Sequence, residues 1–231
     1  MKYSNICAGE FIRRPNRFIA EVLIDGEKTI CHVRNTGRLK ELLTEKALVY
    51  LEKSSNPKRK TSCSLISVKK GNQIINIDSQ IPNKVFHEAL SSGRILLPGV
   101  EKINHIKSES RYGSSRFDFY IESGNTKAYI EIKGVTLEEN GVVRFPDAPT
   151  TRGVKHIYEL VNAKKDGFNA YIVFIIQMNN VKYFTPNDKT HKEFGDVLRY
   201  AKSQGVAILA YKSDVTPDSI ELNGKRCKVI L

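Results

Sequence analysis

The periodicity of the apolar residues changes near residue 80, and this change constrains the fold more than any other feature of the sequence. Before it, the chain consists of short alternating segments such as "RFIAEVLID" and "ALVYLEK", which end at turn residues such as Asp25-Gly26. Such short strands, with one short helix expected at "RLKELL", indicate a small β-barrel over residues 1–80. The five-stranded oligonucleotide-binding (OB) barrel is the natural candidate, and an SH3-like barrel fits the pattern nearly as well.

After residue 80, helical and strand patterns alternate. The segments "PNKVFHEALSSG", "TRGVKHIYELVNAKKDG" and "KEFGDVLRYAKSQG" have helical spacing, and "AYIVFIIQM" has the length and composition of a buried strand. The last segment, "SIELNGKRCKVIL", is expected to form a hairpin across Asn223-Gly224. We therefore expect residues 81–231 to form a second domain, an α/β sandwich with a mixed sheet.

Composition limits the partners and the compartment. The formal net charge of +12 favours a polyanion, most often nucleic acid, and residues 1–90 hold 16 Lys or Arg against 9 Asp or Glu. The four cysteines are scattered and form no CxxC pair, which argues against a zinc site and fits a reducing cytoplasm. We find no signal peptide, and no apolar run reaches the roughly 18 residues of a membrane span.

Basic residues at strand ends and turns of the first domain can track a phosphate backbone, although each one alone is better explained as a solvated charge. In the second domain, a helix that begins near Thr151 carries basic residues in its first turns, where free N–H groups also favour phosphate. Lys155 and Glu159 could instead form an ion pair, because they are four residues apart. The candidate DNA-binding residues are Arg13, Arg17, Arg34, Arg38, Arg59, Arg152 and Lys155.

Two carboxylates and a lysine interrupt the apolar segments "SRFDFYIES" and "KAYIEIKGV". Glu131 and Lys133 are two residues apart and share one face of a strand. The Gly124-Asn125 turn between the segments can bring Asp118 on the neighbouring strand close to them. They either solvate an ordinary hairpin or hold a metal. Interior charges are costly unless they are paired or bind a metal, and this favours the second interpretation.

A metal-dependent nuclease requires this set of groups. Mg²⁺ prefers hard oxygen ligands and is usually held by one or two carboxylates, with water and phosphate in its remaining positions. A neighbouring lysine can orient the attacking water or offset charge on the scissile phosphate. The D-x₍ₙ₎-E-x-K pattern predicts metal ligands at Asp118, Glu131 and the carbonyl of Ile132, with Lys133 as the catalytic lysine.

Seven segments spread over nearly the full length of the chain are informative together: "NRFIAEV", "HVRNTGRLKELL", "KRKTSCSL", "YGSSRFDF", "YIEIKGVTL", "FPDAPTTRGVKHIYEL" and "GVAILAYKS". In these segments the chain resembles the sugar fermentation stimulation protein A family. The resemblance implies an OB-like first domain and a second domain like the PD-(D/E)xK nucleases. It also implies binding to single- or double-stranded DNA with little sequence preference.

The resemblance extends the site prediction. It implies that Asp118 and Glu131 are metal carboxylates for Mg²⁺ or Mn²⁺, that Lys133 is the catalytic lysine, and that a further acid lies on the preceding helix. Glu88 fits that helical position, and Glu109, just before the first strand, is the alternative. The competing functional hypothesis is a non-catalytic DNA-binding regulator of sugar metabolism, chiefly of maltose, that keeps the nuclease fold as a scaffold.

Overall fold

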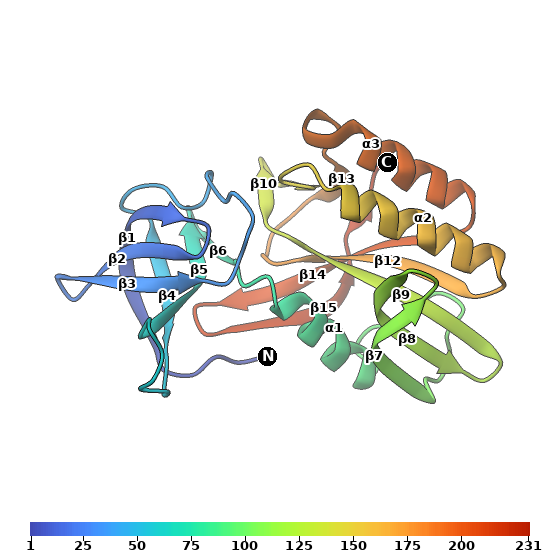
Figure 1. The fold of residues 1–231 in the computed structure, drawn as a ribbon, viewed down its shortest axis with the longest axis horizontal. Coiled ribbons are helices and arrows are strands. Elements are labelled where there is room, and N and C mark those ends of the chain that lie inside the picture. Colours follow the sequence, from blue (N-terminus) through green and yellow to red (C-terminus); the bar gives the residue numbers. More distant parts are fainter.

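The computed structural model describes residues 1–231. The first domain is a closed β-barrel in which β3 pairs parallel to β5 and the other neighbours pair antiparallel (Figure 1). The ring order β1-β2-β3-β5-β4, together with the pairing of β1 with β4, confirms the predicted OB-like barrel over an SH3-like one. The strands are β1 (Ile6–Asn16), β2 (Ile19–Ile24), β3 (Glu27–Val33), β4 (Leu48–Lys53) and β5 (Cys63–Lys70), and β6 (Gln73–Asn76) extends the sheet beside β5.

The helix expected at residues 38–43 does not form. Leu39 has a left-handed φ of 51°, which interrupts a right-handed helix, and Leu39 and Leu42 are both buried in the barrel core. The guanidinium of Arg14 also donates to the carbonyls of Gly37 and Arg38. The segment is therefore a buried turn, and its leucines fill one end of the barrel.

The second domain has three layers, as predicted: helices cover both faces of a six-stranded mixed sheet (Figure 1). Its strand order is β15-β14-β12-β9-β8-β7, with β12 parallel to β9 and β14 and the outer strands antiparallel. The strands are β7 (His105–Tyr112), β8 (Ser115–Ser123), β9 (Thr126–Val135), β12 (Asn169–Ile176), β14 (Ala207–Thr216) and β15 (Ser219–Arg226).

The apolar face of α1 (Ile81–Ser91) packs on one side of this sheet, and α2 (Thr151–Lys165) and α3 (Asp188–Ser203) pack on the other. Because successive strand residues point to opposite faces, the alternation of β9 divides its apolar side chains between two cores. Ile130 and Ile132 lie in the core under α1, whereas Tyr129 lies in the core under α2. A smaller sheet consists of β10 (Leu137–Glu139), β11 (Val142–Phe145), β13 (Tyr183–Pro186) and β16 (Lys228–Val229).

The second domain contains one strand that was not expected, and one expected hairpin is wrong. The segment "HIKSESRY" forms the edge strand β7, which its largely polar sequence did not indicate. The chain does not fold back at Asn223-Gly224: β15 runs through these residues, and its turn with β14 lies earlier, between the paired Thr216 and Ser219. β16 then joins the smaller sheet, because β13 offers it a parallel partner.

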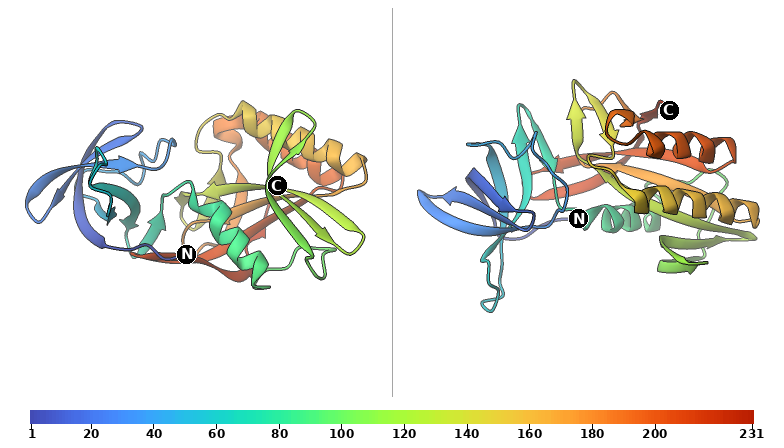
Figure 2. Two further views of the ribbon diagram at one scale, coloured as in Figure 1. Left: turned by 60° about the horizontal axis from the view of Figure 1, so that its bottom comes forward. Right: turned by 45° about the horizontal axis from the view of Figure 1, so that its top comes forward.

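The two domains share a bonded interface. Lys2 forms a β-bridge with Ser219, so the first residues belong to the second domain before the chain enters the barrel (Figure 2). On the barrel side, Ile75 bridges to Met178, and the backbone N–H of Asn76 donates to the carbonyl of Gln177. The linker after β6 thus runs along the second domain and leads directly into α1.

Candidate active site

The β8–β9 hairpin places the two predicted carboxylates opposite each other. Its two-residue turn, Gly124-Asn125, pairs Ser123 with Thr126, and the pairing continues to Phe119 and Ile130. Asp118 and Glu131 are the next facing positions. There the strands separate, and the N–H of Ile132 donates to Asp118 Oδ2 at 2.7 Å.

A polar cavity of about 360 Å³ opens where the two strands separate. Asp118, Glu131, Ile132 and Lys133 all line it, so the structure brings the four predicted residues together. Of the other lining residues, sequence reasoning had placed only Glu109 and Arg152 at the site. The full set is Ser79, Gln80, Asn83, Glu109, Arg116, Arg152 and His156.

Asp118 is held at both of its oxygens. Asn83 of α1 donates its side-chain N–H to Oδ1 at 2.8 Å, and the backbone N–H of Ile132 binds Oδ2. Burial, and next the negative charge of Glu131, raise the pKa of Asp118 above its ordinary value, although these hydrogen bonds oppose the shift. A bound cation would relieve both causes of the raised pKa.

Glu131 is bound on one oxygen only. Lys133 Nζ donates to its Oε1 at 2.6 Å, and His156 Nδ1 lies 2.5 Å from the same oxygen. Burial alone would raise the pKa of Glu131, but the contacts with His156 and Lys133 outweigh it and lower the pKa. The side chain is 3 % exposed, and its Oε2 has no hydrogen-bond partner.

Helix α2 supplies the basic wall of the cavity. Thr150 caps the helix, because its side chain accepts the N–H of Gly153. In the first turn Arg152 Nε donates to Nε2 of His156, one turn further along, at 3.4 Å. This leaves Nδ1 of His156 to donate to Glu131. Lys155 does not line the cavity and forms no ion pair with Glu159, so only Arg152 of the two predicted basic residues reaches the site.

The further acid expected on α1 is not part of this cavity. Glu88 is exposed and pairs with the amino group of Met1 at 2.8 Å. It follows Asn83 by five positions, which places it about 140° around the helix from the residue that contacts Asp118. The alternative, Glu109 of β7, lines the cavity and pairs with Arg116 at 3.2 Å.

The donor set limits the metal that could bind. No group of three or more His, Cys, Asp or Glu side chains gathers into a metal-binding arrangement. Two carboxylates and a backbone carbonyl suit Mg²⁺ or Mn²⁺, which keep water or phosphate in their remaining positions. The buried Oε2 of Glu131 has no hydrogen-bond partner, although buried polar atoms usually have one. A bound ion would supply the missing partner.

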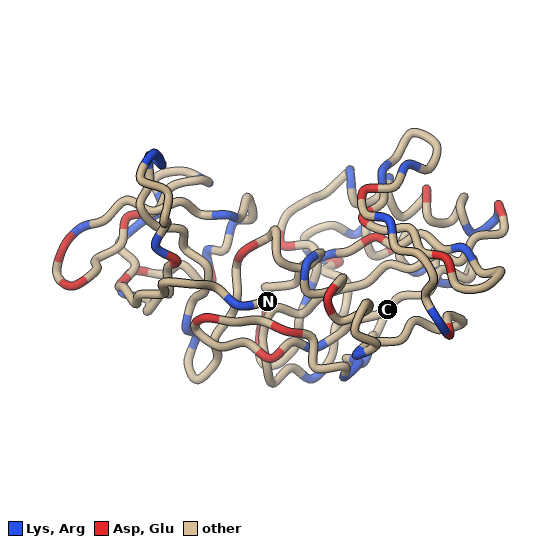
Figure 3. Tube along the Cα trace, turned by 90° about the horizontal axis from the view of Figure 1, so that it is seen from below, with Lys and Arg blue, Asp and Glu red and all other residues tan.

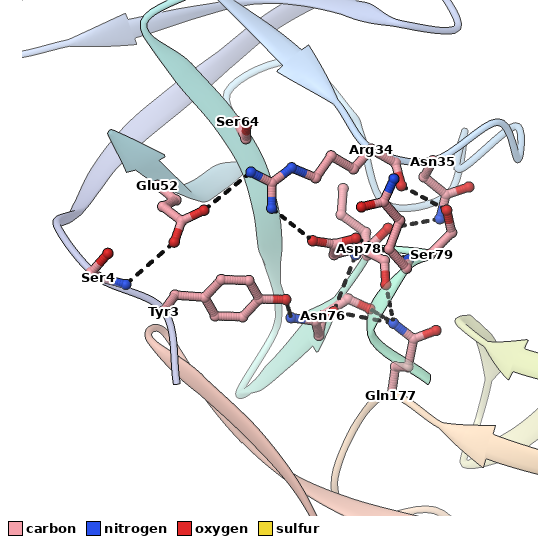
Figure 4. Close-up of polar contacts among 12 residues, drawn as sticks. Tyr3, Ser4, Arg34, Asn35, Glu52, Ser64, Asn76, Asp78, Ser79 and Gln177 are labelled. Atoms are coloured by element: carbon pink, nitrogen blue, oxygen red, sulfur yellow. Dashed lines mark hydrogen bonds and ion pairs between the residues drawn. The ribbon is translucent and has the colours of Figure 1, made fainter. Parts of the chain in front are cut away.

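The arginines predicted to contact DNA differ in whether their side chains already form ion pairs within the protein. Arg34 bridges Glu52 and the fully buried Asp78, each at 3.2 Å, so its charge is paired with two acids of the first 80 residues, beside the domain interface (Figure 4). The contact of Arg34 with phosphate stays a prediction, and it would have to compete with these two ion pairs. Arg38 is exposed and is bound through its backbone N–H, which donates to Asp147 beside the start of α2.

The other predicted contacts of the barrel lie on its surface. Arg13 pairs with Glu21 at 2.6 Å, Arg17 lies over the ring of Phe18, and Arg59 donates to the hydroxyl of Ser64. Figure 3 shows Lys and Arg in both domains, interspersed with Asp and Glu. The net charge is therefore spread along the molecule and is not confined to the barrel.

Known proteins match this chain along its length. The family model described as "SfsA N-terminal OB domain" matches residues 12–77, and "Sugar fermentation stimulation protein RE domain" matches residues 80–219. The sugar fermentation stimulation protein homologs of Clostridium beijerinckii and Desulfitobacterium hafniense are each 56% identical; the first alignment covers 96% of both chains, and the second covers 96% of this chain and 95% of the relative.

A solved structure is also similar. The structure of Pyrococcus furiosus SfsA in complex with Ca²⁺ superposes with a TM-score of 0.89 at 31% identity, and the match covers 100% of this chain and 98% of that one. No helix here has the length and apolar character that crossing a bilayer requires.

Proposed function

Because the chain belongs to the sugar fermentation stimulation protein family, we propose that it binds DNA and hydrolyses phosphodiester bonds at the cavity around Asp118 and Glu131. The proposed cofactor is Mg²⁺, which Mn²⁺ can replace, and the recognition of DNA has little sequence preference. The OB-like barrel would hold the strand, and the second domain would cut it.

The observation that carries this proposal is the state of Glu131. Its Oε2 is buried and without a partner beside Asp118, whose pKa is raised by burial and by Glu131 itself. Both features would be costly in a purely structural cluster and are expected of an oxygen site that binds a cation. Pyrococcus furiosus SfsA forms a complex with Ca²⁺, another hard cation that prefers oxygen ligands, and this supports the same interpretation.

Each residue of the cavity has a role in the proposed reaction. Asp118, Glu131 and the carbonyl of Ile132 would hold the ion; Asn83 and His156 would fix the two carboxylates. A bound Mg²⁺ supplies a more acidic water and neutralises charge on the phosphate. Lys133 would orient that water or offset charge that develops on the phosphate oxygens.

A nuclease assay on single- and double-stranded DNA, with Mg²⁺, Mn²⁺ or EDTA, tests the proposal. We expect hydrolysis with either metal and none in EDTA. Lys133→Ala should lower the rate by about 100-fold or more, the usual effect of removing one group that stabilises a transition state. Lys127→Ala is the matched control, because Lys127 lies exposed near the other end of the same strand.

Two other results would reject parts of the proposal. Salt-sensitive DNA binding without hydrolysis under any metal condition would favour the non-catalytic DNA-binding regulator of sugar metabolism. The absence of salt-sensitive binding to either form of DNA would reject both functions.

A further inference from the structure

Helix α1 presents a polar stripe next to the catalytic cavity. The apolar face of this helix is buried in the core. Its polar residues recur at intervals of three or four positions, so they lie together on the opposite, exposed face. This stripe, which includes the residue before the helix, consists of Gln80, Asn83, Lys84, His87 and Glu88.

The stripe forms one wall of a second hollow, of about 470 Å³, and strands β7 and β8 form the other wall. We call it the α1 groove. Four of its residues also line the catalytic cavity, so the two hollows meet at Asp118. The shared residues are Gln80, Asn83, Glu109 and Asp118; the groove alone is lined by Lys84, His87, Glu88, Ser108 and Phe119.

Apart from Asp118, which belongs to the proposed metal site, the charged residues of the α1 groove leave one free cation. Glu88 is neutralised by the amino group of Met1, and Glu109 by Arg116. Lys84 is exposed and forms no ion pair or hydrogen bond. A groove lined mainly by polar residues, with a free ammonium group, can bind a phosphate.

The groove also contains an aromatic platform. The exposed ring of His87 lies against the buried ring of Phe119, with centroids 5.9 Å apart and planes tilted by 32°. His87 makes no hydrogen bond that would occupy its ring nitrogens. An imidazole supported from behind can stack on a nucleobase.

We infer that the α1 groove binds the nucleotide next to the scissile phosphate, with its phosphate at Lys84 and its base on His87. The inference rests on the proposed function and names its substrate class. In a duplex, neighbouring bases cover each base face, so stacking on His87 requires an unpaired base. The preferred substrate is therefore single-stranded DNA or a frayed end.

Fluorescence anisotropy with labelled DNA tests the inference, with Ca²⁺ present as the divalent ion. The probes are a single strand of about 12 nucleotides, within the range that one OB barrel covers, and a blunt duplex of the same sequence. We expect His87→Ala to weaken single-strand binding about tenfold, the usual effect of losing one stacked base. His87→Phe should keep the affinity, because it keeps the stacking surface.

Lys84→Ala should weaken single-strand binding and flatten its salt dependence by about one unit of slope. His105→Ala and Lys127→Ala are the matched controls, because both residues are exposed and lie outside the α1 groove. Thermal denaturation of each variant checks folding.

Three outcomes would overturn the inference. Unchanged single-strand affinity in both His87→Ala and Lys84→Ala removes the groove from the binding path while leaving the proposed function intact. An equal loss for the duplex rejects the single-strand assignment. A wild-type protein that binds neither probe rejects the proposed function and this inference together.

Discussion

At the scale of single residues, the environments of the two carboxylates push their pKa values in opposite directions. Burial and Glu131 raise the pKa of Asp118, whereas His156 and Lys133 overcome the effect of burial and lower the pKa of Glu131. Glu131 is therefore the carboxylate that stays ionised most easily, and Asp118 gains most from a cation. This asymmetry makes Asp118 the more informative residue to change.

Asp118→Asn should leave the protein folded and, in EDTA at neutral pH, at least as stable as the wild type. Because the pKa of Asp118 is raised, the folded state binds the proton more tightly than the unfolded state does. The free energy of unfolding therefore falls as the pH rises from the ordinary value of 3.8 through the pKa of the folded state. Asparagine removes this loss, and it can still accept the N–H of Ile132. Thermal denaturation against pH measures the difference.

The same variant should lose its response to metal. A ligand at about 100 times its Kd stabilises the native wild type by about 2.7 kcal/mol, and Asp118→Asn should show little of this gain with Mg²⁺ or Mn²⁺. Asp25→Asn, at an exposed turn, is the control. A metal response that survives in Asp118→Asn would place the ion elsewhere.

The sequence predicts part of this site because the relevant contacts are local. The alternation of a strand places Glu131 and Lys133 together, and a two-residue turn at Gly124-Asn125 aligns Asp118 with Glu131. Asn83 and His156 come from α1 and α2, whose rotation and docking depend on packing far along the chain. No local pattern signals them.

At the scale of elements, the loop after β3 joins the barrel to the start of α2. The backbone N–H of Arg38 donates to Asp147, and the backbone N–H and hydroxyl of Ser79 donate to the carbonyl of Arg34. Gly37 is required here, because a Cβ atom at this position would lie 2.5 Å from a carboxylate oxygen of Asp147. Sequence reasoning interpreted this loop as a basic turn. It could not identify the ion pair of Arg34 with the buried Asp78, because Asp78 lies 44 residues away in the chain.

Arg34 is therefore expected to stabilise the fold, and Arg38 to contact DNA. Single substitutions, Arg34→Ala and Arg38→Ala, should distinguish these two roles. Removing Arg34 leaves Asp78 buried without its ion pair and should cost about 3 kcal/mol. Arg38→Ala should change stability by less than about 0.5 kcal/mol, because its side chain is exposed. Urea denaturation measures both effects.

The two variants should differ in DNA binding as well. Arg38→Ala should reduce the slope of log affinity against log salt by about 1 and weaken binding to all sequences alike. If Arg34→Ala proves as stable as the wild type, the role assigned to Arg34 at the interface is wrong. An unchanged slope for Arg38→Ala would remove it from the DNA surface.

At the scale of the whole molecule, the domains are held together through buried polar groups. Gln177 donates its side-chain N–H groups to the carbonyls of Asn76 and Asp78 at 3.0 and 3.1 Å, and Asn76 donates to the hydroxyl of Tyr3 (Figure 4). Gly134, next to Lys133, allows this approach, because a Cβ atom there would lie 2.4 Å from Gln177 Oε1. The domain contact therefore adjoins β9, the strand that carries Glu131 and Lys133.

Gln177→Ala should weaken the coupling between the domains. It removes the side-chain donor of the Asn76 carbonyl, and losing such a bond at a buried group costs about 1–3 kcal/mol; the Asp78 carbonyl keeps the N–H of Ile81. We expect the wild type to unfold in one calorimetric transition and the variant to unfold at lower temperature, with the barrel and the second domain partly separated. Gln204→Ala, at the exposed end of α3, is the control. A variant that unfolds as the wild type does would show that this network does not couple the domains.

The bridge between Lys2 and Ser219 also affects how the protein is made. Domains generally fold in order as the ribosome releases them, so the barrel can close early. Tyr3 belongs to the core of the second domain, and its backbone N–H bonds to the carbonyl of Asp218. The segment before the barrel thus waits for β15, and the second domain can complete its core only after the chain has been synthesised as far as Ser219.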